Sequence, residues 1–267
     1  ASGGGASGGG AVGSNSKVAH SGFVLGSKNV LSNISPILDK KLKEHAIQEV
    51  VVVGHSLGAG VASIAAVALA EQYPELVDNQ RLTCSAFACP PSMSLALSNT
   101  TVKYITSIVH SDDCICSASI HSFVHLFNEI HASDGVSYTI KVADQLLAKL
   151  QTGDPRKDWL IDQMKDRLHL DREAGANAAA ADVQSGREEE EEEAWTVPHT
   201  PPLFPAGRLI HMVREEPDTT PSAAYVAMDA TNRSERFGAI HLGETMLSDH
   251  SLDMYEIALQ ECFKTKV

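Results

Sequence analysis

Residues 50–60 read Val50-Val51-Val52-Val53-Gly54-His55-Ser56-Leu57-Gly58-Ala59-Gly60, an apolar β-branched run that ends in a Gly-x-Ser-x-Gly pentapeptide. In a nucleophile elbow the serine sits in a strained strand-to-helix turn, and glycines two residues before and after it let the backbones pass closely. Residues 47–53 have the composition of a buried parallel strand, and residues 57–72 are Ala-rich with helical spacing. Strand, turn and helix therefore occur where this motif requires them.

Length, charge and cysteine content narrow the class of protein. A chain of 267 residues can form one large α/β domain or two small ones. The net charge of -13, six units of which come from residues 188–193, argues against nucleic acid as a partner. Five cysteines without a signal peptide predict reduced thiols, which favours a cytoplasmic or membrane-peripheral protein. No window holds eighteen uninterrupted apolar residues, so we expect no transmembrane segment in this chain.

Two segments have compositions that cannot support a packed core. Residues 1–16 are a Gly/Ser repeat, which we expect to be a flexible segment. Residues 171–194 consist mostly of Ala, Gly, Arg and Glu, and we expect them to form a disordered acidic insertion. The fold is therefore expected to lie within residues 17–267.

The remaining sequence alternates between strand and helix patterns. A turn at residues 20–23 leads into a helix that carries apolar residues from 30 to 42. Expected strands cover residues 81–88, 102–110, 207–214, 223–228 and 239–242, and expected helices cover residues 57–72, 92–98, 120–130, 142–150, 159–168 and 252–263. This alternation predicts an α/β fold with a mostly parallel central sheet and helices on both faces.

A serine hydroxyl becomes a good nucleophile only when a histidine accepts its proton and a carboxylate orients that histidine. In folds with this elbow the order along the chain is serine, acid, histidine. Asp112-Asp113 stands at the carboxyl end of an expected strand; Asp113 is the preferred acid and Asp112 the alternative. His250, in the loop before the last helix, is the expected base. Such chemistry requires no cofactor and no metal.

Several separate stretches, taken together, resemble the fungal-type (class three) triacylglycerol lipases, and most closely their sn-1-specific diacylglycerol lipase branch. The stretches that carry the likeness are His20-Ser21-Gly22-Phe23, residues 51–62, Ala86-Phe87-Ala88-Cys89-Pro90-Pro91, residues 105–113, residues 203–211 and residues 246–250. Their order along the chain is the same as in that family. The likeness spans about residues 20–132 and again residue 202 to the end.

The resemblance implies an α/β-hydrolase fold for residues 17–267, with Ser56 as nucleophile, Asp113 as triad acid and His250 as general base. It also implies cleavage of an acyl ester of a glycerolipid, diacylglycerol in particular, at a membrane or lipid surface through an acyl-enzyme. For the oxyanion hole, the backbone N–H of Leu57 is the one donor that can be named.

The sequence departs from the family pattern in two places. Cys114-Ile115-Cys116-Ser117 follows the acid where the family has Val-Pro-Arg, so we expect the packing of this loop and an arginine contact to be lost. Nothing before His20 resembles the family's Arg-Gly-Thr-like segment, which supplies an oxyanion donor, so we expect the N-terminal strands to be missing. The alternative function is a catalytically inactive or truncated lipase-like domain that binds lipid or protein.

Overall fold

The computed structural model describes residues 16–44, 47–132, 201–214, 225–230 and 236–264. The chain divides into two compact units, Ala1–Phe123 with Val197–Val267, and Val124–Thr196. The expected flexible segment up to residue 15, the acidic insertion at 171–194, and the expected helices at 142–150 and 159–168 lie outside the described residues.

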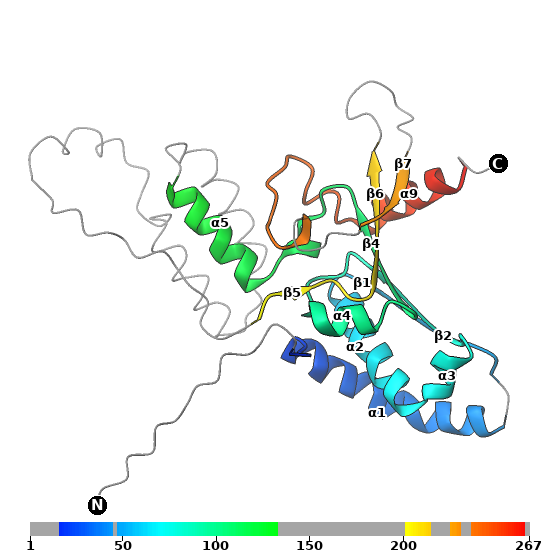
Figure 1. Cartoon of the computed structure of the whole chain (residues 1–267). Helices are drawn as coiled ribbons and strands as arrows, with labels where there is room; N and C mark the ends of the chain where they lie inside the picture. The colour runs from blue at the N-terminus through cyan, green and yellow to red at the C-terminus, as the bar shows by residue number, and fades with distance from the viewer. Residues whose placement is uncertain (1–15, 45–46, 133–200, 215–224, 231–235, 265–267) are drawn as a thin grey trace, which may run out of the picture. The chain divides into compact units, whose positions relative to one another are not determined.

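The first unit is built around a five-stranded sheet with the order β1-β2-β4-β6-β7 (Figure 1). The strands are β1 (Val50–His55), β2 (Leu82–Phe87), β4 (Ile105–His110), β6 (Arg208–Arg214) and β7 (Tyr225–Asp229). Neighbouring strands from β1 to β6 are parallel, and β7 pairs antiparallel with β6. A separate pair of short antiparallel strands joins β3 (Met93–Ser94) to β5 (Leu203–Phe204). The mostly parallel sheet predicted from the sequence is confirmed.

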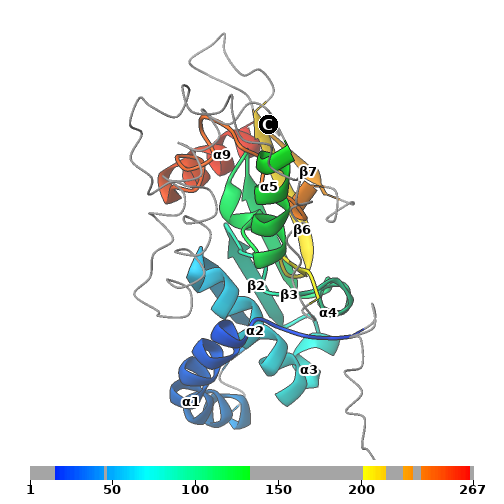
Figure 2. The same ribbon diagram turned by 90° about the vertical axis from the view of Figure 1, so that its left-hand side faces the viewer.

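Helices cover both faces of this sheet, as predicted. On one face, α2 (Leu57–Gln72) packs against β1 and β2, and α1 (Ser21–Lys43) packs against α2 (Figures 1 and 2). On the other face, α9 (Leu252–Lys264) contacts β4, β6 and β7. Cys84 and Ile105 belong to the cluster beneath α2, whereas Phe87 and Ile108 contact the cluster beneath α9. A parallel sheet covered on both faces, with a serine elbow after its first described strand, is an α/β-hydrolase fold.

Further helical segments accompany these elements. They are α3 (Pro74–Asp78), α4 (Leu95–Thr100), a 3₁₀ turn (Cys114–Ser117) and α5 (Ile120–Ala132), which begins in the first unit and continues into the second. The helix expected at residues 92–98 corresponds to α4, which begins only after the short strand β3. The sequence did not predict α3.

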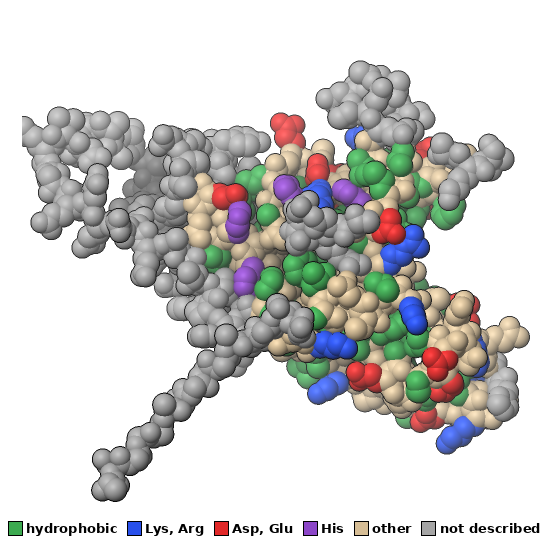
Figure 3. Space-filling model, viewed as in Figure 1, with side chains coloured by type: hydrophobic (Ala, Val, Ile, Leu, Met, Phe, Trp, Pro, Cys, Tyr) green, Lys and Arg blue, Asp and Glu red, His purple; other side chains and the backbone are tan. Residues whose placement is uncertain are grey.

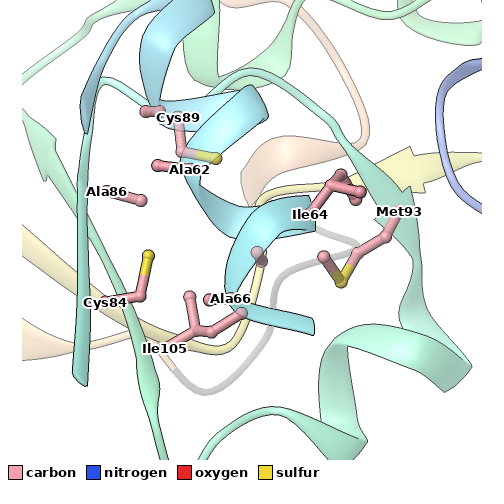
Figure 4. Packing of buried hydrophobic residues seen from close by; sticks show 10 residues of the cluster. Ala62, Ile64, Ala66, Cys84, Ala86, Cys89, Met93 and Ile105 are labelled. Atoms are coloured by element: carbon pink, nitrogen blue, oxygen red, sulfur yellow. The ribbon is translucent and has the colours of Figure 1, made fainter. Parts of the chain in front are cut away.

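Small side chains allow α2 to lie close against the sheet. Ala62 and Ala66 of α2 are buried in one cluster with Cys84 and Ala86 of β2 (Figure 4). None of these side chains is larger than that of cysteine. The helix backbone therefore approaches the strands closely, and Ile105 fills the space beside them. The start of α2, which carries the serine elbow, is thus fixed by packing along the whole helix.

Three local expectations were wrong. Residues 20–23 are not a turn before a helix, because α1 already begins at Ser21. Residues 239–242 form no strand. β1 is not buried on both faces: Val51 and Val53 are exposed, because β1 lies at the edge of the described sheet and α2 covers only its other face.

The surface of the described residues carries charges of both signs. On the face shown in Figure 3, lysine and arginine side chains are interspersed with aspartate and glutamate side chains. Among the described helices, none combines the length and the apolar character needed to cross a bilayer.

Gly54 and Gly58 offer a test of the backbone crossing in the elbow. A Cβ on Gly54 would collide with the backbone carbonyl of Gly58, whereas a Cβ on Gly58 would meet no atom within 4 Å. We expect Gly54→Ala to lower the free energy of unfolding by about 1–3 kcal/mol or more, as overpacking of a rigid site does. Gly58→Ala should stay within about 1 kcal/mol of wild type, because alanine also favours helix. Chemical denaturation measures both, and equal losses would contradict this backbone contact.

The buried cysteines should be inert in the folded protein. Burial raises the pKa of Cys84 to about 12, so its thiol is protonated at pH 8 and also inaccessible. Cys262 is only half-buried. We expect iodoacetamide at pH 8 to label Cys262 before Cys84, and to label both after unfolding in guanidinium chloride. Mass spectrometry of tryptic peptides measures the order, and rapid labelling of Cys84 in the folded chain would contradict the packing.

Candidate active site

Ser56 lies in a strained turn between β1 and α2. Its backbone has φ 57° and ψ -126°, in a region that residues with a side chain rarely occupy. The Ser56 N–H donates to the Phe87 carbonyl at 3.0 Å, and the Ser56 carbonyl accepts from the Ala59 N–H at 2.9 Å. The end of β2 and the first turn of α2 therefore hold the turn that the Gly-x-Ser-x-Gly pattern predicts.

The structure brings Ser56, His250 and Asp113 together. His250 Nε2 is 2.9 Å from Ser56 Oγ, and His250 Nδ1 is 3.1 Å from each carboxylate oxygen of Asp113. A neutral imidazole protonated on Nδ1 satisfies both contacts: Nδ1–H donates to Asp113, and Nε2 accepts from the Ser56 hydroxyl. This arrangement lets Nε2 take the serine proton while the carboxylate stabilises the resulting imidazolium.

The Asp113 carboxylate is fully buried and is satisfied by several donors. Oδ1 accepts from the Ile115 N–H at 2.9 Å, and Oδ2 accepts from the Tyr255 hydroxyl at 2.7 Å. Burial, with a further contribution from Cys116 and Asp113, raises the pKa of Tyr255 well above its ordinary value, so the hydroxyl stays protonated. These hydrogen bonds offset the cost of burying a carboxylate and fix the side on which it meets His250.

Asp112, the alternative acid, contacts Arg236 and not His250 in the described residues. Its side chain is 55% exposed, and its carboxylate pairs with the Arg236 guanidinium at 2.9 Å. Arg236 also donates to the Ser111 carbonyl at 3.3 Å. Of the two adjacent aspartates, only Asp113 contacts His250 in the described residues.

The loop after Asp113 is packed, contrary to the expectation. Residues Cys114–Ser117 form a 3₁₀ turn in which Cys114, Cys116 and Ser117 are buried. Asp113 caps this turn through its bond to Ile115. The arginine nearby is Arg236, from the segment after β7, and it contacts Ser111 and Asp112, which precede Asp113, rather than this loop. Two buried thiols thus pack the loop that lacks the Val-Pro-Arg pattern.

His55 contacts the candidate base, although its place beside Ser56 in the sequence did not predict this. Its Nε2–H donates to the His250 carbonyl at 3.1 Å, and the two imidazole rings lie 5.1 Å apart. Burial, and secondarily the neighbouring His250, lowers the pKa of His55 and so favours its neutral form. A charge on His55 beside the candidate base is thereby disfavoured.

A second Ser-His-Asp set lies nearby but lacks the geometry of a nucleophilic triad. Ser111 Oγ is 3.4 Å from His110 Nε2, and His110 Nδ1 is 3.7 Å from Asp249 Oδ1. His110 is 0% exposed, and its Nε2 already lies 3.1 Å from the Tyr225 hydroxyl. A substrate therefore cannot reach this imidazole.

The Leu57 N–H, the expected oxyanion donor, is at the first position of α2. Within the described part of the chain it makes no hydrogen bond, as expected for the first turn of a helix. It adjoins Ser56, and the dipole of α2 adds a partial positive charge at this end. The described residues contain no group of three His, Cys, Asp or Glu side chains placed to hold a metal ion.

Residues 9–123 match the family model described as Lipase (class 3). The matched segment includes Ser56 and Asp113 and ends before His250. A comparison with curated proteins gives no match.

Among solved structures, a lipase from Rhizopus microsporus var. chinensis is 23% identical, with 40% of this chain and 38% of that chain covered and a TM-score of 0.36. The mono- and diacylglycerol lipase from Aspergillus oryzae is 30% identical, with 38% and 36% covered and a TM-score of 0.32. A mutant of MDLA from Penicillium cyclopium is 17% identical, with 88% and 58% covered and a TM-score of 0.45. The chain thus spans less than two thirds of each of these proteins, and its sequence is similar to the class 3 lipase family over residues 9–123.

Proposed function

We propose that this chain is a serine carboxylic-ester hydrolase that cleaves an acyl ester of a glycerolipid. The observation that carries the proposal is the continuous contact from Ser56 Oγ through the His250 imidazole to the Asp113 carboxylate. The family match over residues 9–123 supports the lipase class. The resemblance of the sequence motifs to diacylglycerol lipases makes diacylglycerol the proposed substrate.

The reaction follows from the roles of the three side chains. Ser56 Oγ attacks the ester carbonyl carbon while His250 Nε2 takes the hydroxyl proton, and Asp113 stabilises the imidazolium. The Leu57 N–H donates to the oxyanion of the tetrahedral intermediate. Collapse expels the glycerolipid alcohol, which takes the proton from His250 and leaves an acyl-serine. Water, deprotonated by His250, then attacks the acyl-serine and releases the fatty acid and free Ser56.

Two exposed apolar side chains adjoin the reacting groups in sequence and suit an acyl substrate. Leu57 follows Ser56 directly, and Leu252 lies two residues after His250; both are more than half exposed. Large apolar side chains at the surface next to a reactive centre favour an apolar ligand or a lipid surface over a small polar ester. Their position supports a substrate presented at a membrane or lipid surface.

A second candidate is a lipase-like domain that binds lipid or protein without turnover. One observation favours it: within the described residues, the Leu57 N–H is the single donor identified for the oxyanion. Loss of one oxyanion donor costs about 100- to 1000-fold in kcat in a serine protease. Hydrolysis of an ester by the purified chain separates the two candidates.

Replacement of the nucleophile or the base should remove turnover. We expect Ser56→Ala and His250→Ala to lower kcat on diacylglycerol in mixed micelles by about 10⁴- to 10⁶-fold, because the triad acts as a unit. His241→Ala, which alters an exposed histidine, serves as the control and should retain activity. Fatty-acid release measures turnover, and a fluorophosphonate probe reports the nucleophile. Labelling that persists in Ser56→Ala would refute this assignment; binding of diacylglycerol micelles without hydrolysis would favour the second candidate.

The adjacent aspartates allow a matched test of the acid. Asp113→Asn should lower kcat by about 10⁴-fold, because an amide in place of the carboxylate no longer holds the productive tautomer of the histidine. Asp112→Asn, one residue earlier, removes only the exposed ion pair with Arg236, which typically contributes about 1 kcal/mol or less. We therefore expect it to lower kcat by less than about tenfold. Initial rates at saturating substrate measure both; a reversed order would assign the acid to Asp112.

A further inference from the structure

A second histidine-aspartate pair lies between the same two loops as the candidate triad. His110 ends β4, three residues before Asp113, and Asp249 directly precedes His250. The partners are therefore crossed: the last residue of β4 is the histidine of one pair, and the loop after β4 supplies Asp113, the aspartate of the other. The loop before α9 supplies the aspartate of the first pair, Asp249, and the histidine of the second, His250.

Asp249 links the two loops through its carboxylate. Its Oδ2 accepts from the Asp112 N–H at 3.2 Å and from the Thr245 hydroxyl at 2.8 Å, and the side chain is buried. The Asp112 N–H belongs to the residue before Asp113, while the backbone of Asp249 continues directly into His250. A shift of Asp249 would therefore displace both members of the His250–Asp113 contact.

His110 fixes the peptide that precedes His250. Its Nδ1–H donates to the Asp249 carbonyl at 3.0 Å, and this carbonyl belongs to the peptide bond that joins Asp249 to His250. On the other side of the ring, Nε2 accepts from the Tyr225 hydroxyl at 3.1 Å, and the Tyr225 oxygen accepts from Arg214 at 3.1 Å. The ring is fully buried, so both of its nitrogens are held by protein atoms.

Tyr255 joins the two crossed pairs. Its hydroxyl oxygen accepts from the His110 N–H at 3.1 Å and its proton goes to Asp113 Oδ2 at 2.7 Å. The end of β4, the acid and the first turns of α9 therefore form one hydrogen-bonded unit. A side chain within this unit can influence the acid and the base without contacting the substrate.

We infer that His110 and Asp249 are positioning residues, which hold the Asp249–His250 peptide and the Asp112–Asp113 segment so that His250 stays aligned with Ser56 and Asp113. This inference rests on the proposed function, because the alignment matters for proton transfer from Ser56. A misplacement of about 1 Å by a residue remote from the chemistry can cost about 100-fold in rate. The effect should fall on kcat, because neither side chain reaches the substrate.

The two nitrogens of His110 can be tested separately. The side-chain amide of His110→Asn can replace Nδ1–H toward the Asp249 carbonyl, whereas that of His110→Gln reaches toward Tyr225. We expect His110→Gln and Asp249→Ala to lower kcat about 100-fold with KM nearly unchanged, and His110→Asn to lose less than about tenfold. Tyr225→Phe removes the Nε2 contact, together with the Arg214 contact to the same hydroxyl, and leaves the Nδ1–H bond in place, so it should stay within about twofold in kcat. Thermal unfolding of each variant shows whether it is folded at the assay temperature.

A spectroscopic measurement tests the alignment without turnover. The low-field ¹H NMR signal of the His250 Nδ1–H, assigned by its absence in His250→Ala, reports the bond to Asp113. We expect the signal to persist in His110→Asn and Tyr225→Phe and to be lost in His110→Gln and Asp249→Ala. The inference is overturned if the folded variants His110→Gln and Asp249→Ala retain the signal, or if Asn and Gln at position 110 lower kcat equally. If wild type shows no hydrolysis but the signal follows the expected pattern, the proposed function fails while the positioning of His250 stands.

Discussion

The unfavourable backbone conformation of Ser56 is the constraint on which the rest of the site depends. A φ of 57° is adopted by a non-glycine residue only where the surroundings fix it. Here the surroundings are the bond from the Ser56 N–H to Phe87 and the dense packing of α2 against β2 through small side chains. In this conformation Ser56 Oγ lies 2.9 Å from His250 Nε2. The hydroxyl can therefore meet an imidazole that belongs to neither element.

The buried Asp113 carboxylate is the second requirement, because a charge in the interior is tolerated only when its oxygens are hydrogen-bonded. The donors come from three places: the turn that follows it, the Tyr255 hydroxyl in α9, and His250 in the loop before that helix. Each donor is needed to satisfy the charge, and each ties a different segment to the end of β4. Burial of this one group thus assembles segments that are more than a hundred residues apart in sequence.

Local patterns were sufficient to predict a mostly parallel sheet and to name the three side chains that the structure brings together. The elbow pentapeptide, the polar pair after an expected strand and the histidine before the last helix lie at recognisable element ends. The partners of those residues were not predictable, because they depend on how distant segments meet. In the sequence, His110 lies in an expected strand and Asp249 in an expected loop, and Arg236 lies in a segment without a motif. The error at β1 has a similar cause: its sequence has the apolar composition of a buried strand, but burial depends on neighbouring elements.

The two crossed histidine-aspartate pairs differ in exposure, and this difference separates their roles. A base that passes a proton between a hydroxyl, a leaving alcohol and water must have one nitrogen accessible to substrate. His250 meets this requirement, since its side chain is 24% exposed and its Nε2 faces Ser56. His110 does not, since its ring is 0% exposed and both nitrogens contact protein atoms. An imidazole so enclosed can exchange no proton with a substrate, but it can hold a peptide bond in place. Because that peptide leads directly into His250, the buried pair also restricts the position of the accessible histidine.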